Sequence, residues 1–90
     1  VKPQFEVGKD RLGSGGVVRS ASLRAEVTAE VALYAQSLGL SVRGVTASPL
    51  PGPSGNVEYF LWLVKDAAAS AHEPESVKQM VEAAVEEGPQ

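Results

Sequence analysis

A lysine and a glutamate are the residues of this 90-residue chain best placed for acid–base chemistry. Glu58 stands at the entry of an almost wholly apolar run that ends at Val64. A carboxylate there loses hydration, which disfavours its charged form unless a cation or several hydrogen-bond donors meet it. Lys2 is the partner that the predicted strand order offers. Such a pair can hold and move a proton, and a structural ion pair is the simpler alternative.

Three polar residues flank the predicted position of this pair. Ser48, Ser54 and Asn56 lie in or beside a connector with three prolines and two glycines between residues 48 and 55. Hydroxyl and amide groups suit hydrogen bonding to a sugar or a base, so these residues are candidates for substrate binding. The alternative is that they satisfy backbone groups of the turn.

The charges of the chain are unevenly distributed along the sequence. Residues 1–24 carry five basic and two acidic side chains, whereas residues 66–90 carry one basic and six acidic side chains. A polyanion would therefore approach the first quarter of the chain, and we predict that Lys9 and Arg11 contact it. Solvated charged faces would explain the same pattern.

Hydrophobic periodicity predicts an α/β fold with the order strand, helix, strand, strand, helix. Residues 1–7 and 40–47 are expected as strands, with Gly44 as the place for a bulge, and residues 57–64 as a strand buried on both faces. One helix is predicted from its apolar stripe, capped by Ser20 or Ser22 and ended by Gly39, and a second begins near Pro74 and ends before Gly88. The first stripe consists of Leu23, Val27, Val31, Tyr34 and Leu38.

The order of elements brings Lys2 and Glu58 to the same rim of a sheet. A strand–helix–strand unit makes a right-handed crossover, so the first two strands should be parallel. The third strand is the most apolar and is predicted between them, antiparallel to both, in a three-stranded mixed sheet. Ligands of open α/β sheets bind at the rim where the parallel strands end.

The glycines at positions 13, 15 and 16 belong to a loop that fails the common phosphate-binding patterns. Residues 8–14 read GKDRLGS, with a serine where a Walker-type loop needs its lysine, and the G-x-G at position 13 has Val18 where a third glycine is required. A loop that closes over a substrate is the functional interpretation, and ordinary loop flexibility the simpler one.

The composition excludes several kinds of site. The chain has no cysteine and one histidine, so neither disulfides nor a thiolate or imidazole metal centre is expected. No apolar run approaches the roughly 20 residues of a membrane helix. A single cytoplasmic domain is expected over residues 1–90, and the absence of a start methionine favours a piece of a longer protein.

Two segments resemble a known family. VKPQFEVGKDRLGSGGVVR at the start and ASPLPGPSGNVEYFLWL later are similar to the carboxyl-terminal part of the TlyA family. These proteins, historically called haemolysins, are S-adenosylmethionine-dependent ribosomal RNA 2′-O-methyltransferases of the FtsJ-like group with a Rossmann-like fold. The resemblance implies that the chain is the carboxyl-terminal third of a catalytic domain, and that its substrate partner is ribosomal RNA or a ribosomal subunit.

The resemblance also implies roles for the first pair of residues. FtsJ-like enzymes surround the target ribose with a Lys-Asp-Lys-Glu tetrad, whose second lysine matches Lys2 and whose glutamate matches Glu58. Lys2 would accept or steer the proton of the ribose 2′-hydroxyl, and Glu58 would orient that lysine. The other tetrad members, the S-adenosylmethionine site and an S4-like RNA-binding domain would all precede Val1, so no cofactor-binding residue is expected here.

The ninety residues alone are therefore expected to be inactive and to self-associate through the exposed edge of the first strand. Two other functions remain open from the sequence. The basic residues could dock on RNA or on a protein without any chemistry, or, as the haemolysin label suggests, the chain could act on membranes. The acidic second helix argues against membrane activity.

Overall fold

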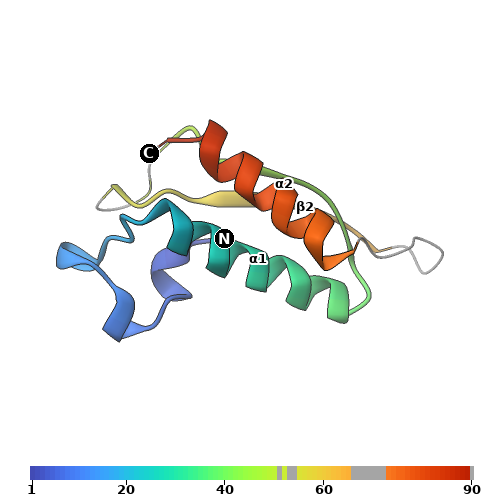
Figure 1. Cartoon of the computed structure of the whole chain (residues 1–90), viewed down its shortest axis with the longest axis horizontal. Helices are drawn as coiled ribbons and strands as arrows, with labels where there is room; N and C mark the ends of the chain where they lie inside the picture. The colour runs from blue at the N-terminus through green and yellow to red at the C-terminus, as the bar shows by residue number, and fades with distance from the viewer. Residues whose placement is uncertain (51, 53–54, 66–72, 90) are drawn as a thin grey trace.

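The computed structural model describes residues 1–50, 52, 55–65 and 73–89. Three short 3-10 turns come first, η1 (Pro3–Phe5), η2 (Lys9–Arg11) and η3 (Ser14–Gly16). They are followed by α1 (Ala21–Ser37), β1 (Ser41–Ala47), β2 (Tyr59–Val64) and α2 (Pro74–Glu87). Both helices pack on the same side of the β1–β2 hairpin, so the molecule has one helical layer and one sheet layer (Figure 1).

The helix α1 begins and ends where its capping residues predict. The Ser20 side chain accepts a hydrogen bond from the Leu23 amide at 3.2 Å, which satisfies one free donor of the first turn. Gly39 follows the helix with φ at 91°, a left-handed conformation that favours glycine.

The predicted apolar stripe of α1 is buried only in its first half. Val27 is fully buried against Val7 and Val18 of the turn region, but Tyr34 is 66% exposed and Leu38 64% exposed. The helix instead packs against α2 and the sheet through small side chains, among them Ala29 and Ala32. The expectation that the whole stripe faces a core was wrong, because the 3-10 turns cover only its amino-terminal half.

The two strands form the predicted antiparallel pair. Ser41 lies opposite Val64 and Ala47 opposite Tyr59. The register slips between Val42 and Gly44, which confirms the predicted bulge and leaves Arg43 as the extra residue.

The prediction that the strand over residues 57–64 is buried on both faces was wrong. Tyr59 is 1% exposed and packs with Val81 and Val85 of α2, whereas Phe60 is 60% exposed and Trp62 67% exposed. Alternation along β2 sends odd-numbered side chains to the helical layer and even-numbered ones to the other face of the hairpin. No described element covers that second face.

The predicted first strand over residues 1–7 is absent, and with it the three-stranded mixed sheet. The described residues form a two-stranded sheet, and Pro3 starts the turn η1 directly after Lys2. Among residues 1–7, Val1 is the residue that pairs with β2. Its carbonyl accepts from the Tyr59 amide at 2.9 Å and its amino group donates to the Tyr59 carbonyl. Proline presets a turn conformation at this point, which ends any extended segment.

The helix α2 matches its prediction. Pro74 occupies the first turn and Gly88 caps the end with a 3.0 Å hydrogen bond from its amide to the Ala84 carbonyl. Val77, Val81 and Val85 are buried against the sheet and α1.

A buried arginine joins three parts of the fold. Arg24 of α1 is 2% exposed and donates through Nε to the Tyr59 hydroxyl at 3.1 Å. Its Nη1 donates to the backbone carbonyls of Val18 at 3.3 Å and Arg19 at 3.1 Å. The charged group is therefore held by neutral oxygens from β2 and from the segment before α1, which ties these segments to the helix.

We expect Tyr59→Phe to destabilise the chain by about 1–3 kcal/mol, because it removes an acceptor from the buried Arg24 guanidinium. Tyr34→Phe is the matched control, since the Tyr34 side chain is 66% exposed. Urea unfolding curves of the two variants test this. Equal stabilities would show that the Arg24–Tyr59 hydrogen bond contributes nothing.

Candidate functional site

Main-chain pairing brings Lys2 and Glu58 to facing positions. Val1 and Tyr59 exchange two hydrogen bonds, as residues of a narrow antiparallel pair do. The residue after Val1 then faces the residue before Tyr59, and Lys2 keeps an extended conformation with φ −112° and ψ 95°. The pair predicted from the sequence therefore starts from neighbouring backbone positions.

The side chain of Glu58 lies on the face of the hairpin opposite the helices. Its neighbours Val57 and Tyr59 are 6% and 1% exposed and belong to the same core cluster. Since successive side chains of an extended segment alternate, Glu58 shares its face with Phe60 and Trp62. The glutamate is half-buried and Lys2 is exposed.

The two side chains do not form an ion pair in the described part of the chain. The Glu58 carboxylate instead lies against Gly52, where a Cβ would come within 2.9 Å of the carboxylate carbon. The turn around it is closed by hydrogen bonds from the Gly52 amide to the Asn56 carbonyl at 2.8 Å and from the Gly55 amide to the Gly52 carbonyl at 3.0 Å. Glycine at position 52 leaves the space that Glu58 occupies.

Two of the predicted substrate-binding residues, Asn56 and Ser48, make hydrogen bonds within the fold. Asn56 is 3% exposed, and its side chain accepts from the Val18 amide at 2.9 Å and donates to the Gly16 carbonyl at 3.0 Å. The Ser48 hydroxyl bonds the backbone of Leu50. Ser54 lies outside the described residues. Binding of substrate by these three residues stays a prediction.

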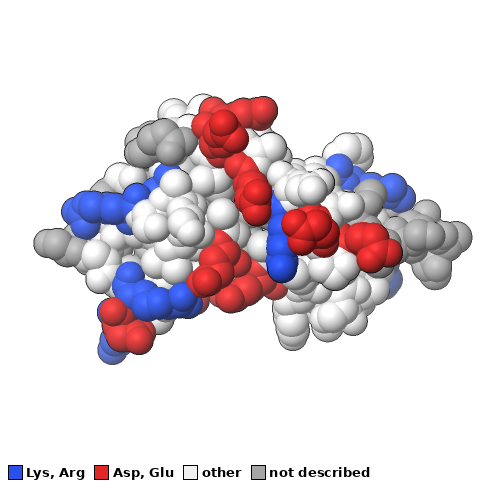
Figure 2. All heavy atoms as spheres, in the orientation of Figure 1, with Lys and Arg blue, Asp and Glu red and all other residues white. Residues whose placement is uncertain are grey.

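Lys9 and Arg11 lie in the turn η2, and both are exposed. Arg11 is already engaged, because its Nη1 is 2.6 Å from Glu26 Oε2 and its Nε donates to the Val7 carbonyl at 3.1 Å. Figure 2 shows basic side chains at the end of the molecule that carries the 3-10 turns and again at the opposite end, with acidic side chains across the helices between them. Lys9 is thus better placed than Arg11 to meet an anion.

One ionisable group near the predicted pair has a shifted pKa. Burial lowers the pKa of the Val1 α-amino group below its usual value, and the Glu58 and Glu6 carboxylates act in the opposite direction. The field of Glu58 therefore reaches the backbone next to Lys2.

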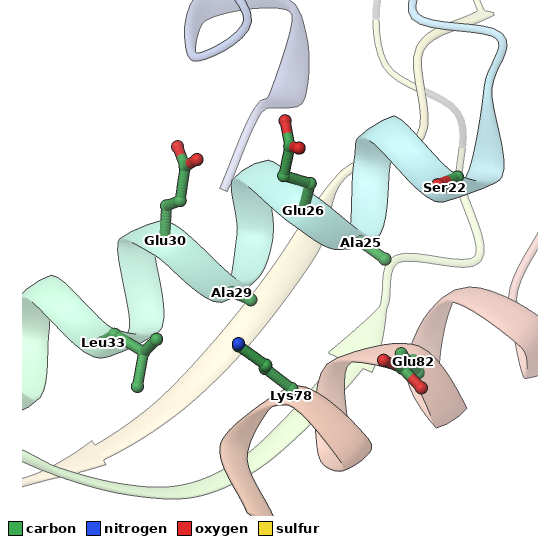
Figure 3. A pocket seen from close by; sticks show the side chains of 8 residues that line it. All are labelled: Ser22, Ala25, Glu26, Ala29, Glu30, Leu33, Lys78 and Glu82. Atoms are coloured by element: carbon green, nitrogen blue, oxygen red, sulfur yellow. The ribbon is translucent and has the colours of Figure 1, made fainter. Parts of the chain in front are cut away.

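A groove between α1 and α2 lies away from this pair. This groove of about 560 Å³ has Ala25, Ala29 and Leu33 on the α1 side. Figure 3 shows Lys78 reaching from α2 toward α1, while Glu26 and Glu30 point away from α2. Neither Lys2 nor Glu58 lines the groove, and its carboxylates would repel RNA.

Gly52 and Arg24 were not among the predicted site residues, although both act on the surroundings of Glu58. Gly52 could not be recognised from the sequence, because a glycine between prolines indicates only a turn. Only a weak sequence pattern could have indicated that Arg24 is buried. It is followed at helical spacing by Thr28, Ala32 and Ala35, all buried, so a charged residue heads a stripe of small side chains.

The family of the chain follows from a comparison with known proteins. The model of the FtsJ-like methyltransferases matches residues 1–65, which contain Lys2, the turn region, the hairpin and Glu58. The chain belongs to the FtsJ-like methyltransferase family.

Relatives of this FtsJ-like chain include enzymes that act on ribosomal RNA. The chain is 56% identical over 91 residues to the 16S/23S rRNA (cytidine-2'-O)-methyltransferase TlyA from two strains of Mycobacterium tuberculosis. The match covers 99% of this chain and 33% of that relative, so the chain spans about a third of the relative's length. It is also 32% identical to Hemolysin A of Brachyspira hyodysenteriae over 67% of the chain and 25% of that protein.

A solved structure shares the fold. A Streptococcus thermophilus protein named as a hemolysin superposes with a TM-score of 0.77 at 38% identity. The superposition covers 97% of this chain and 31% of that one. In the described part of the FtsJ-like chain, no helix combines the length and the apolar character needed to span a bilayer.

The described residues do not fit a pocket for S-adenosylmethionine, the cofactor of these methyltransferases. The glycine-rich segment forms the turn η3, follows no strand, and is held by the side chain of Asn56. A dinucleotide-type site needs a glycine-rich turn between a strand and a helix.

We expect Gly52→Ala to displace the Glu58 side chain, because the added Cβ would overlap its carboxylate. Gly44→Ala is the matched control, since a Cβ there meets only Trp62 at 3.7 and 3.9 Å and neither glycine has a positive φ. Backbone amide chemical shifts of residues 56–59 should change in the first variant and stay constant in the second. Unchanged shifts in both would show that Glu58 does not need this space.

Proposed function

We propose that this chain forms part of the catalytic site of an rRNA 2′-O-methyltransferase, in which Lys2 and Glu58 are catalytic residues. One observation carries the proposal. The Val1–Tyr59 hydrogen bonds bring Lys2 and Glu58 to facing positions in a chain of the FtsJ-like family. The Mycobacterium tuberculosis relative is named for the same reaction on 16S and 23S rRNA.

Lys2 would accept or steer the proton that leaves the ribose 2′-hydroxyl. Glu58 would orient the lysine and stabilise the ammonium that results. A lysine side chain is long enough to reach either a ribose or a facing carboxylate, and exposed Lys2 is free of an ion pair with Glu58 in the described residues. The Lys2 side chain can therefore point toward the substrate while the Glu58 side chain stays against the turn at Gly52.

S-adenosylmethionine would be held by the part of the enzyme that precedes these residues in longer relatives. It supplies the methyl group when bound. The role of this chain is confined to the proton and to the ribose, which is why we expect the isolated chain to be inactive.

The preceding part would also complete the sheet. Val1 runs antiparallel to β2 at Tyr59, so residues before it would continue along the same edge past Leu61 and Leu63. Such a strand would restore the three-stranded mixed sheet of a Rossmann-like methyltransferase, with β2 central. In its absence we expect copies of the chain to self-associate along this edge.

Ribosomal RNA would approach from the 3-10 turns. Lys9 is exposed there, whereas the helical surface carries Glu26, Glu30 and Glu82 (Figure 3). The Ser48 amide donates to the Glu58 carbonyl at 2.8 Å, and Ser54 and Asn56 shortly precede Glu58 in the sequence. We propose these three residues as the hydrogen-bonding groups for the target nucleotide. The enzyme would work in the cytoplasm, where ribosomes are.

The role of the pair can be tested in a chimera, in which these ninety residues replace the matching third of the Mycobacterium tuberculosis relative. We expect Lys2→Ala and Glu58→Ala each to abolish methyl transfer to rRNA. Affinity for S-adenosylmethionine should stay nearly intact, because the cofactor contacts lie elsewhere.

Lys65→Ala in the same chimera is the control, since Lys65 is an exposed lysine after β2. It should keep full activity. Wild-type rates in Lys2→Ala or Glu58→Ala would show that the pair is structural, and turnover by the isolated ninety residues would overturn the division of roles between the two parts.

We expect Lys9→Ala to weaken rRNA binding by the chimera and to lower the salt dependence of binding by about one counterion. Lys78→Ala is the matched control, because Lys78 lies among the carboxylates of the α1–α2 groove. Binding curves at several salt concentrations measure both effects. An equal loss of rRNA affinity in the two variants would contradict this prediction, because it would indicate that RNA contacts the helical surface.

A further inference from the structure

A closed set of hydrogen bonds surrounds the backbone that carries Glu58. The Arg24 guanidinium donates to the Tyr59 hydroxyl at 3.1 Å and to the Val18 carbonyl at 3.3 Å. The Val18 amide donates in turn to the Asn56 side chain at 2.9 Å. Asn56 precedes Glu58 by two residues and Tyr59 follows it directly, so the covalent chain closes the set. We call Arg24, Val18, Asn56 and Tyr59 the hydrogen-bond ring.

The members of the hydrogen-bond ring are shielded from water. Tyr59 is 1% exposed, Arg24 2%, and Val18 and Asn56 3% each. A hydrogen bond in such a place cannot be replaced by one to water, so its loss leaves a donor or an acceptor unpaired. The ring therefore fixes α1, the segment before it and the start of β2 relative to one another, and Glu58 is held from both sides.

An arginine is an unfavourable residue for the centre of this ring if stability is its only purpose. Its guanidinium is charged, and the oxygens of Tyr59, Val18 and Arg19 that accept from it belong to neutral groups. Burial of a charge without an opposite charge costs stability, and an apolar side chain of similar size would fill the space without that cost. The arginine supplies instead a rigid fork of N–H donors that holds several acceptors in one geometry.

We propose that Arg24 is a positioning residue for methyl transfer, which keeps Glu58 in place through Tyr59 and Asn56. The proposal rests on the proposed function, in which Glu58 orients Lys2. Arg24 acts through the strand, since its guanidinium bonds the Tyr59 side chain in the core whereas the Glu58 side chain lies on the open face of the hairpin, the one opposite the helices. A displacement of about 1 Å at a reacting group can lower a rate about a hundredfold, so a loosened ring should slow the reaction without weakening binding.

Two variants of the chimera test the role of Arg24. Arg24→Lys keeps the positive charge but loses the fork of donors, and Tyr59→Phe removes only the hydroxyl group that accepts from it. We expect each variant to lower kcat for methyl transfer by about tenfold or more, with KM for rRNA and for S-adenosylmethionine unchanged. Because both variants break the same hydrogen bond, the double variant should lose little more than Arg24→Lys alone.

Val77→Ala is the control for a general loss of stability. Val77 of α2 is fully buried and packs with Ala32 and Val42, outside the hydrogen-bond ring. Its truncation should lower the midpoint of thermal unfolding but keep kcat at a temperature where circular dichroism shows every variant to be folded. A loss of kcat in Val77→Ala as large as in Arg24→Lys would overturn the proposal, because activity would then follow stability alone.

Glu58→Ala in the same assay separates this proposal from the proposed function. Loss of activity in Glu58→Ala, with wild-type kcat in both Arg24→Lys and Tyr59→Phe, would overturn the role of Arg24 and leave the proposed function intact. A raised KM with an unchanged kcat would also overturn it, since Arg24 would then serve substrate affinity. A wild-type rate in Glu58→Ala would overturn both.

Discussion

The packing of Tyr59 is the constraint on which the rest of the structure depends. Its ring lies in the core between the hairpin and the helices, its hydroxyl accepts from buried Arg24, and its backbone pairs with Val1 on one side and lies in register with Ala47 on the other. Because side chains alternate between the two faces of a strand, fixing the Tyr59 side chain also fixes the face on which each neighbouring side chain lies. Glu58 and Phe60 must lie on the open face.

The surroundings of Glu58 are built from backbone and buried polar groups more than from charge pairs. Asn56 links the glutamate's turn to the segment of Gly16 and Val18, and Arg24 links the same segment to β2. The hydrogen bonds from the Val18 amide to Asn56 and from Arg24 to Tyr59 and Val18 are buried, so breaking one of them leaves a polar group without water or partner.

The division of the surface follows from the same arrangement. The helices carry most of the acidic side chains, and the 3-10 turns carry exposed basic ones (Figure 2). The proposed catalytic pair lies at the rim between the basic turns and the open face of the hairpin. In the proposed enzyme, RNA would therefore meet the turns, with the acidic helices directed away from it.

The sequence by itself determined the local structure, because capping, glycine conformations and turn residues act over a few positions. Ser20 and Gly39 bound α1, the bulge precedes Gly44, and the hairpin and α2 lie where periodicity predicted them. Strand order and the family motif predicted that Lys2 and Glu58 lie close together. The Val1–Tyr59 hydrogen bonds bring their backbones to facing positions, and the catalytic roles of the two side chains stay a prediction. Tertiary structure alone decided which apolar side chains are covered. Apolar character predicts burial for Tyr34, Leu38, Phe60 and Trp62. Whether they are covered depends on which other elements pack over them.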